Sequence, residues 1–304
     1  MPRTPPPRSF SRRRTGLSDE TFDTLVFDWD GTVVPDRLAD AKEARDRIEK
    51  LSDAGVHIFI VSGTHVENVD GQLRARPRCR GHLFVCCNRG SEVFRVTGDG
   101  TQLLDRRTAS VDEDRALDLA AARTVEHLRE RGLEARVVAN RLNRRKIDII
   151  AVPEWADPKK AEIGRLLNAV MARLAAVDMA DLSEVIDVAA GAAHAAGLAD
   201  PRITSDVKHV EIGLTDKSDS ARWAAGWLVQ RGITGELILV GGDEFGPIGG
   251  ATGSDSFMMV DALSRAPVVS VGVEPSGVPE GVVQLGGGPD PFRQAPRCAA
   301  HSSS

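Results

Sequence analysis

The sequence has few of the features that mark membrane, disulfide-stabilised or zinc-binding proteins. No segment of its 304 residues approaches the continuous apolar length needed to span a bilayer. The four cysteines, Cys79, Cys86, Cys87 and Cys298, include no C-x-x-C pair. The seven histidines are scattered without the spacing of zinc ligands. We therefore expect a cytoplasmic protein with reduced thiols, no membrane association and no zinc site.

The sequence also lacks a strong excess of charge. A net charge of −5 gives no general attraction to nucleic acid or to an anionic membrane. Residues 1–20 are rich in Pro, Arg and Ser, which predicts a disordered basic arm, either solvated or weakly bound to an acidic partner. No apolar stretch follows its three consecutive arginines, so it is not a twin-arginine export signal. Residues 286–304 are rich in Gly, Pro and Ser, which predicts a disordered tail.

The most informative stretch is a short apolar strand that ends in two carboxylates. Residues 25–27 are apolar, and Asp28 and Asp30 follow at a spacing of two. Side chains two residues apart leave a strand on the same side, so both carboxylates are presented together. Gly31 and Thr32 then turn the chain. An ordinary strand followed by an Asp-Gly turn is the alternative interpretation.

Paired carboxylates repel each other unless a cation joins them. Mg²⁺ suits such a site because it prefers oxygen ligands and bridges readily to phosphate. One carboxylate could then act as a nucleophile that forms an aspartyl-phosphate, and the other could handle the proton of the leaving group. In an open α/β sheet, this strand end is also where ligands bind.

Further strands and helices place other polar residues at the same edge. A helix at residues 36–54 and a buried strand at 56–61 form a crossover unit with parallel strands. The second strand ends at Ser62-Gly63, whose hydroxyl and N–H groups suit a phosphate, although Ser also commonly caps helices. The same logic resumes with a helix at 217–231 and a strand at 237–240, which place Lys217, Asp243 and Glu244 at strand ends or helix starts. A glycine-rich loop then leads to Asp255.

The residues between these two parts follow a different pattern. A hairpin at 91–105 is followed by three helices and four further strands, and this mixed pattern indicates a separate α+β module at residues 89–205, with the last strand just beyond it. The helices are expected at residues 112–131, 159–177 and 181–197. The four further strands are expected around 135–139, 146–151, 202–205 and 208–213, with a basic turn at 141–146 between the first two.

Together these residues form the inventory of a metal-assisted phosphoryl-transfer site, and their order resembles the haloacid-dehalogenase superfamily of phosphohydrolases. Asp28-Trp29-Asp30-Gly31-Thr32-Val33 is similar to its first motif, Ser62-Gly63 to the second, Lys217 to the third, and Asp243 with Asp255 to the fourth. The resemblance implies an α/β fold. Its core would be a doubly wound, Rossmann-like parallel sheet of residues 21–88 and 206–285, with residues 89–205 inserted as a cap. The cap is similar to that of the type IIB group, which contains trehalose-6-phosphate phosphatases, sucrose-phosphatases and phosphomannomutases.

The resemblance also implies roles for individual residues. Asp28 would be the nucleophile and Asp30 the acid, while Thr32, Ser62, Gly63 and Lys217 would hold the phosphoryl group. Asp28, Asp30, Asp243 and Asp255 would bind Mg²⁺. The fourth motif is longer than in most relatives, which leaves Glu244 as the alternative to Asp255.

The cap would select the substrate. Lys208 and Glu211 lie in a stretch that resembles the sugar-binding segment of trehalose-phosphate phosphatases, and Arg144 lies in the basic turn. A polar edge strand and a solvated loop are the alternatives. The resulting hypothesis is a phosphatase of a small phosphorylated sugar such as trehalose-6-phosphate. The alternatives are a phosphomannomutase-like mutase and a non-catalytic regulatory module. Similar modules occur fused to glycoside hydrolases, which implies a functional link to a disaccharide-processing glycosidase.

Overall fold

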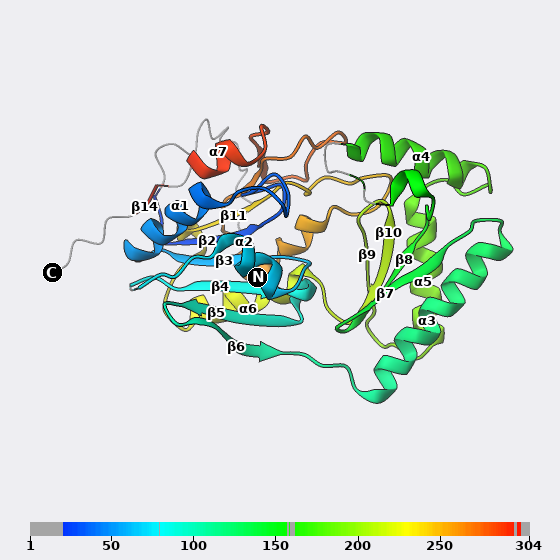
Figure 1. Cartoon of the computed structure of the whole chain (residues 1–304), viewed down its shortest axis with the longest axis horizontal. Coiled ribbons are helices and arrows are strands. Elements are labelled where there is room, and N and C mark those ends of the chain that lie inside the picture. Colours follow the sequence, from blue (N-terminus) through cyan, green and yellow to red (C-terminus); the bar gives the residue numbers. More distant parts are fainter. Residues whose placement is uncertain (1–20, 79, 157, 159–161, 295–296, 299–304) are drawn as a thin grey trace, which may run out of the picture.

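The computed structural model describes residues 21–78, 80–156, 158, 162–294 and 297–298. Within them, an eight-stranded sheet and a four-stranded sheet lie side by side (Figure 1). All strand pairs of the larger sheet from β13 to β4 are parallel, and the last two pairs are antiparallel. Its order is β13 (Val282–Gln284), β12 (Val268–Ser270), β11 (Ile238–Gly242), β2 (Thr24–Asp28), β3 (His57–Val61), β4 (Leu83–Cys87), β5 (Glu92–Thr97) and β6 (Gly100–Arg106).

Helices cover both faces of the larger sheet because its central strands are apolar on both sides. Ile58 and Ile60 of β3 belong to one buried cluster with α1 and α2, whereas Phe59 and Val61 belong to another with α6. Successive side chains of a strand point to opposite faces, which explains this division. Figure 1 shows the doubly wound arrangement that the sequence predicts. The helices are α1 (Lys42–Asp53), α2 (Val66–Leu73) and α6 (Lys217–Val229).

The strand order of the larger sheet reverses beside β2. From β2 the sheet extends through β3 and β4 on one side and through β11, β12 and β13 on the other. A crevice for ligands forms outside the carboxyl ends of the strands at such a reversal. Asp28 is the last residue of β2 and Asp243 follows β11, so both lie at this point.

The smaller sheet, which we call the cap sheet, is antiparallel and has helices on one face only. Ile147, Val210 and Ile212 point into a buried cluster with these helices. By alternation, Lys146 and Glu211 lie on the opposite face, which is turned toward the larger sheet (Figure 1). The strand order is β7 (Arg136–Arg141), β8 (Arg144–Asp148), β10 (His209–Gly213) and β9 (Arg202–Ser205). The helices are α3 (Val111–Glu130), α4 (Ile163–Ala175) and α5 (Leu182–Ala195).

Two segments belong to a different sheet from the one that we expected. The hairpin β5–β6, expected at the start of the cap, extends the larger sheet because β5 pairs antiparallel with β4. Strand β10, expected in the core, pairs with β8 and β9 in the cap sheet. The chain therefore leaves the larger sheet after Arg106 and leaves the cap sheet after Gly213. The boundaries that we expected are 88/89 and 205/206. The apolar pattern shows that a strand exists but does not name its partner.

Part of the expected disordered tail, residues 286–304, forms secondary structure. Helix α7 (Pro289–Gln294) begins just after Gly286 and Gly288, whose N–H groups donate to Ser270 and Val271 at 3.3 and 2.9 Å. Strand β14 (Arg297–Cys298) pairs with β1 (Thr21–Phe22). Residues 295–296, 299–304 and the expected basic arm, residues 1–20, lie outside the described residues. Short 3-10 helices lie at Asn88–Gly90, Pro153–Trp155, Gly235–Leu237, Ser254–Met258 and Asp261–Leu263.

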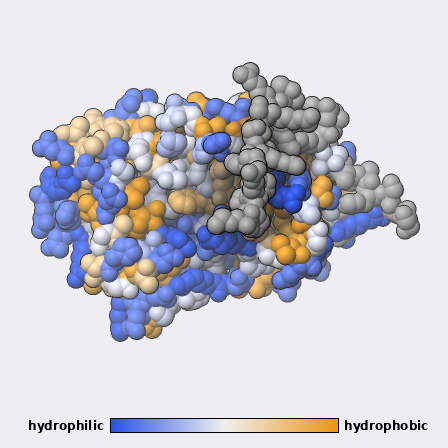
Figure 2. Space-filling model, turned by 180° about the vertical axis from the view of Figure 1, so that it is seen from behind, coloured by the Kyte–Doolittle hydropathy of each residue, from blue (hydrophilic) through white to orange (hydrophobic). Residues whose placement is uncertain are grey.

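Two of the cysteines lie in the core. Cys86 and Cys87 of β4 are buried free thiols, and burial raises the pKa of Cys86 to about 12. Cys79 lies outside the described residues. Among the residues that the structure describes, no helix combines the length and apolarity that crossing a membrane requires. Hydrophilic residues predominate on the face in Figure 2, where apolar residues form separate patches.

Candidate active site

Lys217 joins two of the expected site residues. Its Nζ atom lies 2.7 Å from Asp28 Oδ1 and 2.7 Å from Asp255 Oδ1. All three side chains are nine-tenths or more buried. Burial alone would lower the pKa of Lys217, but the attraction of Asp255 and Asp28 outweighs it, so the pKa is raised. Lys217 therefore remains charged beside the expected nucleophile.

Helix α6 places Lys217 at this point. Asp216 is the N-cap, and its side chain accepts from Ser218 N at 2.7 Å. Asp219 closes the capping box by accepting from Asp216 N at 2.9 Å. Lys217 is consequently the first residue of the helix, directly beside the ends of β2 and β11.

Three carboxylates form a group that fits a divalent cation. Asp28, Asp243 and Asp255 each offer an oxygen, and these atoms all lie within 4.8 Å of one another. With Lys217, the group carries three negative charges and one positive charge, a deficit that one divalent cation balances. Carboxylate oxygens are donors of the kind that Mg²⁺ prefers.

Asp255 is also the residue that organises the stretched fourth motif. Its Oδ2 atom accepts from Asp243 N at 2.8 Å and from Glu244 N at 2.9 Å. The Glu244 carboxylate instead accepts from Ser254 Oγ at 2.9 Å. Between the two alternatives left open by the sequence, this geometry favours Asp255 as the second acid of the motif.

The turn after β2 holds the remaining residues of the first motif. Gly31 has a φ of 89° and donates to Val34 O at 2.6 Å, which closes the turn behind Asp30. Asp30 is half-buried and forms a β-bridge with Val34. Thr32 is buried and donates its hydroxyl to Asp243 Oδ1 at 3.1 Å. Thr32 thus orients the Asp243 carboxylate of this acidic group, and its expected contact with phosphate stays a prediction.

The second motif meets the cap sheet. Ser62 is buried at the end of β3, and its Oγ accepts from Thr64 N at 3.3 Å. Gly63 O accepts from Nη2 of Arg144 at 2.6 Å. Arg144 is buried. Its Nη1 atom has no hydrogen-bond partner in the described structure, and its Nε atom forms an ion pair with Glu211 without hydrogen-bond geometry. Burial, opposed by the attraction of Glu211, lowers the pKa of Arg144 to about 10.

Glu211 lies at the centre of a cationic cluster between the two sheets. Its carboxylate lies 2.9 Å from Arg89 Nε, 3.3 Å from Arg144 Nε and 3.5 Å from Lys146 Nζ. Burial would raise the pKa of Glu211, but these three cations lower it to about 2. Our sequence interpretation missed Arg89. The only local signal in the sequence is the Asn-Arg-Gly stretch directly after a buried strand, and in the structure Arg89 has a φ of 51° there.

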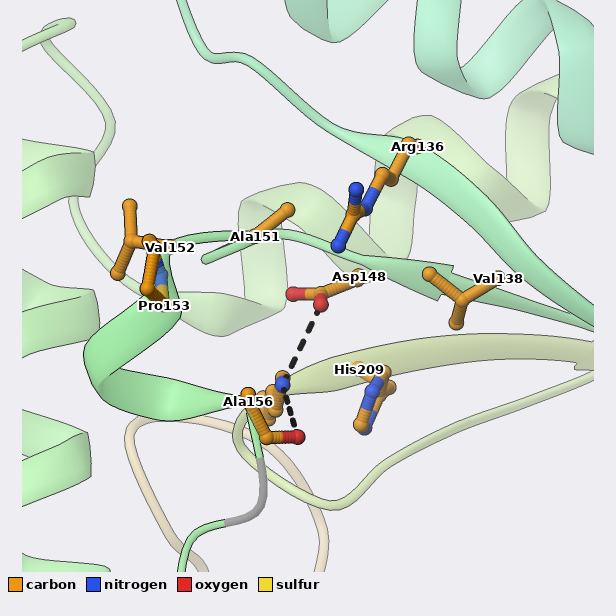
Figure 3. Close-up of a pocket in the computed structure, with 9 residues that line it drawn as sticks. Arg136, Val138, Asp148, Ala151, Val152, Pro153, Ala156 and His209 are labelled. Carbon is orange, nitrogen blue, oxygen red and sulfur yellow. Dashed lines mark hydrogen bonds and ion pairs between the residues drawn. The ribbon is translucent and has the colours of Figure 1, made fainter.

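Lys208 lies apart from Glu211. Its ammonium contacts the backbone oxygens of Trp155 and Ala156, the latter at 3.2 Å, and Asp148 Oδ2 at 3.4 Å. These contacts lie at a cavity of about 360 Å³ within the cap, toward which the side chains of Arg136 and Asp148 point (Figure 3). Lys208 and Glu211 therefore have different contact partners in the described structure. The expected basic turn is also shorter, because Arg144 begins β8 and Arg145 contacts Asp114 and Asp118 of α3.

Comparison with solved structures supports the fold. No protein-family model matches the chain, and no curated protein matches it. The N-terminally truncated IMP-nucleotidase of Plasmodium falciparum is 13% identical with a TM-score of 0.56, over 90% of this chain and 69% of that one. The trehalose-6-phosphate phosphatase of Aspergillus fumigatus is 14% identical with a TM-score of 0.52, over 90% of each chain. These likenesses confirm the haloacid-dehalogenase-like fold, and at such identities they show the fold alone.

Proposed function

We propose that this chain is a Mg²⁺-dependent phosphatase that hydrolyses a small phosphorylated sugar through an aspartyl-phosphate at Asp28. One observation carries the proposal. Asp28, Asp243, Asp255 and Lys217 converge from three separate parts of the chain at the point where the strand order reverses. A purely structural turn needs no such group, because buried like charges are costly without a function or a cation.

The reaction would proceed in two displacements at phosphorus. An oxygen of Asp28 attacks, the bond from phosphorus to the sugar oxygen breaks, and Asp30 gives its proton to the leaving oxygen. Water then attacks the aspartyl-phosphate and gives a proton to Asp30, which releases inorganic phosphate and restores Asp28. Lys217 would balance the charge of the phosphoryl oxygens, and Ser62 and Gly63 would help to hold the phosphoryl group. Mg²⁺, held by Asp28, Asp243 and Asp255, would supply further positive charge.

The substrate class is inferred from the cap. The Glu211 carboxylate suits sugar hydroxyls, and Arg89 and Arg144 add donors beside the second motif. One structural neighbour is a trehalose-6-phosphate phosphatase and another is an IMP-nucleotidase, so a nucleoside monophosphate is the natural competing substrate. A functional link to a disaccharide-processing glycosidase belongs to the same proposal. A non-catalytic module is disfavoured because every expected acid is present, whereas a mutase requires a separate test.

Phosphate release from a panel of esters tests this function. We expect release from phosphorylated sugars, trehalose-6-phosphate among them, to exceed release from IMP. Asp28→Asn should lower the rate by at least about a thousandfold, since loss of a nucleophile costs several orders of magnitude. Asp46→Asn, on the exposed surface of α1, is the matched control and should retain full activity. Retention of more than a thousandth of the rate by Asp28→Asn would contradict covalent catalysis.

Metal removal tests the cofactor. EDTA should abolish phosphate release, and added Mg²⁺ should restore it. Ca²⁺ should restore it poorly, because its longer bonds and higher coordination number would displace the Asp28 carboxylate. Full activity after exhaustive chelation would refute the metal assignment.

A further inference from the structure

Residues 244–253, which we call the bridging loop, connect the larger sheet to the cap. The loop begins directly after Asp243 and ends two residues before Asp255. At its tip, Ile248 and Ala251 exchange backbone hydrogen bonds of 2.9 and 3.0 Å across Gly249 and Gly250. The loop is therefore an ordered hairpin-like turn.

The tip of the bridging loop is seated in the cap. Gly249 O accepts from Leu182 N at 2.9 Å, at the start of α5, and Ala251 belongs to the buried cluster of the cap. A Cβ on Gly249 would lie 2.8 Å from Leu167 Cδ1, and a Cβ on Gly250 would lie 2.4 Å from Asp181 Oδ2. The φ of Gly250 is +84°, which also favours glycine. A side chain at either position would force the tip or the facing Leu167 or Asp181 side chain to shift.

Glu274 holds the root of the bridging loop. Its carboxylate accepts from Phe245 N at 2.7 Å, from Gly246 N at 2.8 Å and from Ser270 Oγ at 2.7 Å. Glu274 is buried and has a φ of 48°, which is uncommon for a residue with a side chain. Such a conformation persists where the surrounding contacts enforce it, and such residues cluster at functional sites.

The root is in turn bonded to the metal carboxylates. Glu244 O accepts from Asp255 N at 2.9 Å, and Asp255 Oδ2 accepts from the N–H groups of Asp243 and Glu244. The peptide group between Glu244 and Phe245 links these contacts, because its N–H donates to Glu274 and its carbonyl accepts from Asp255 N. Hydrogen bonds therefore run from Glu274 through this peptide group to Asp255, and from the Asp255 carboxylate to the backbone N–H of Asp243.

We propose that Glu274 is a positioning residue and that the bridging loop couples the seat of the cap to the geometry of Asp243 and Asp255. The metal half of this inference rests on the proposed function, whereas the coupling itself does not. Coupling between two ends is reciprocal, so a change at either end must be felt at the other.

Hydrogen exchange of the two ends tests the coupling without any enzyme assay. Glu274→Gln alters the root, and Gly250→Ala alters the tip. Peptides covering 243–248 and 180–186 should both exchange at least about threefold faster in each variant, because local openings are cooperative. A variant that changes exchange only at its own end would overturn the proposal. Leu167→Ala, which loosens the cap side of the tip, replaces Gly250→Ala if that variant fails to fold.

Matched controls separate coupling from general destabilisation. Glu280→Gln makes the same chemical change as Glu274→Gln in an exposed residue of the same connection. Gly232→Ala introduces the same strain at a φ of +72°, with no atom within 4 Å of the added Cβ. Neither control should alter exchange at either end of the bridging loop.

Titration calorimetry with Mg²⁺ gives the second measurement. Both Glu274→Gln and Gly250→Ala should weaken Mg²⁺ binding by about tenfold, as loss of outer contacts to metal ligands does. The two controls should remain within about twofold of the unaltered protein. Unchanged Mg²⁺ affinity in Gly250→Ala, with the tip released, would overturn the coupling to the carboxylates. If the unaltered protein binds no Mg²⁺, the proposed function fails, and the exchange experiment still decides the coupling.

Discussion

Glu211 is a carboxylate that three cationic side chains surround at the junction of the two sheets. Its folded pKa, about 2, lies below the ordinary value of 4.5. The ionised form therefore stabilises the folded state above pH 4.5, and this contribution is lost as the pH falls toward 2. The shift corresponds to a free energy on the order of 3 kcal/mol.

We predict that Glu211→Gln lowers the free energy of unfolding most above pH 5 and least near pH 2, because glutamine resembles the protonated acid. Urea denaturation at several pH values measures the difference between variant and unaltered protein. Glu113→Gln is the control, since the pKa of Glu113 is also lowered to about 2 but its side chain is 37% exposed. Solvent screening should make its effect smaller. A Glu211→Gln difference that does not change with pH would contradict the ion-pair account.

Positions that depend on local spacing could be predicted from the sequence, and contacts with distant partners could not. Asp28 ends β2 and Asp30 lies in the turn after it, as the local sequence predicts, whereas their roles stay predictions. Arg89 meets Glu211, which is 122 positions away, and Glu274 meets Phe245, 29 positions away. Neither partner follows any motif or periodicity.

Among the elements, the strands with continuous apolar runs are those that the sequence predicts best. The expected strand at 83–87 is β4, and the expected strand at 56–61 is β3 with one residue fewer. Buried strands of a parallel sheet are apolar on both faces, so their limits are sharp. The partners of β5 and β10 could not be predicted, because register and pairing depend on tertiary contacts. Helix α1 begins at Lys42, later than the expected 36, because Asp36 and Asp40 instead accept from backbone N–H groups in turns.

Two helix caps of the same kind allow a prediction about α6. Asp216 and Ser110 each form a capping box, at the starts of α6 and α3. We predict that Asp216→Ala and Ser110→Ala each lower the free energy of unfolding by about 1 kcal/mol, the usual value of a cap. Only Asp216→Ala should also reduce kcat, because α6 begins with Lys217. Denaturation measures the free energy of unfolding, and phosphate release measures kcat. If both variants lost kcat equally, the cap of α6 would have no specific effect on catalysis.

At the scale of the whole molecule, two sets of side chains lie at the junction of the two sheets. The carboxylates and Lys217 lie at the strand ends of the larger sheet and the start of α6. Glu211 and Arg144 belong to the cap sheet, and Arg144 contacts the second motif. Under the proposed function, a small activated ester would need only the first set, whereas a sugar phosphate would also contact the second. Binding energy from the distant part of a substrate can be used to lower the chemical barrier.

We therefore predict that Glu211→Gln lowers kcat/KM for the sugar phosphate by roughly ten- to a thousandfold, which corresponds to about 1.4–4 kcal/mol. Hydrolysis of p-nitrophenyl phosphate should remain within about threefold, because the core residues are unchanged. Equal losses on both substrates would mean that Glu211 supports the fold or the core site.

The same assay distinguishes a phosphatase from a mutase when inorganic phosphate and sugar isomers are measured together. A phosphatase releases one phosphate for each ester consumed, since water reaches the aspartyl-phosphate. Interconversion of sugar phosphates with little phosphate release, stimulated by a bisphosphate, would instead show that the cap excludes water and returns the phosphoryl group to the sugar.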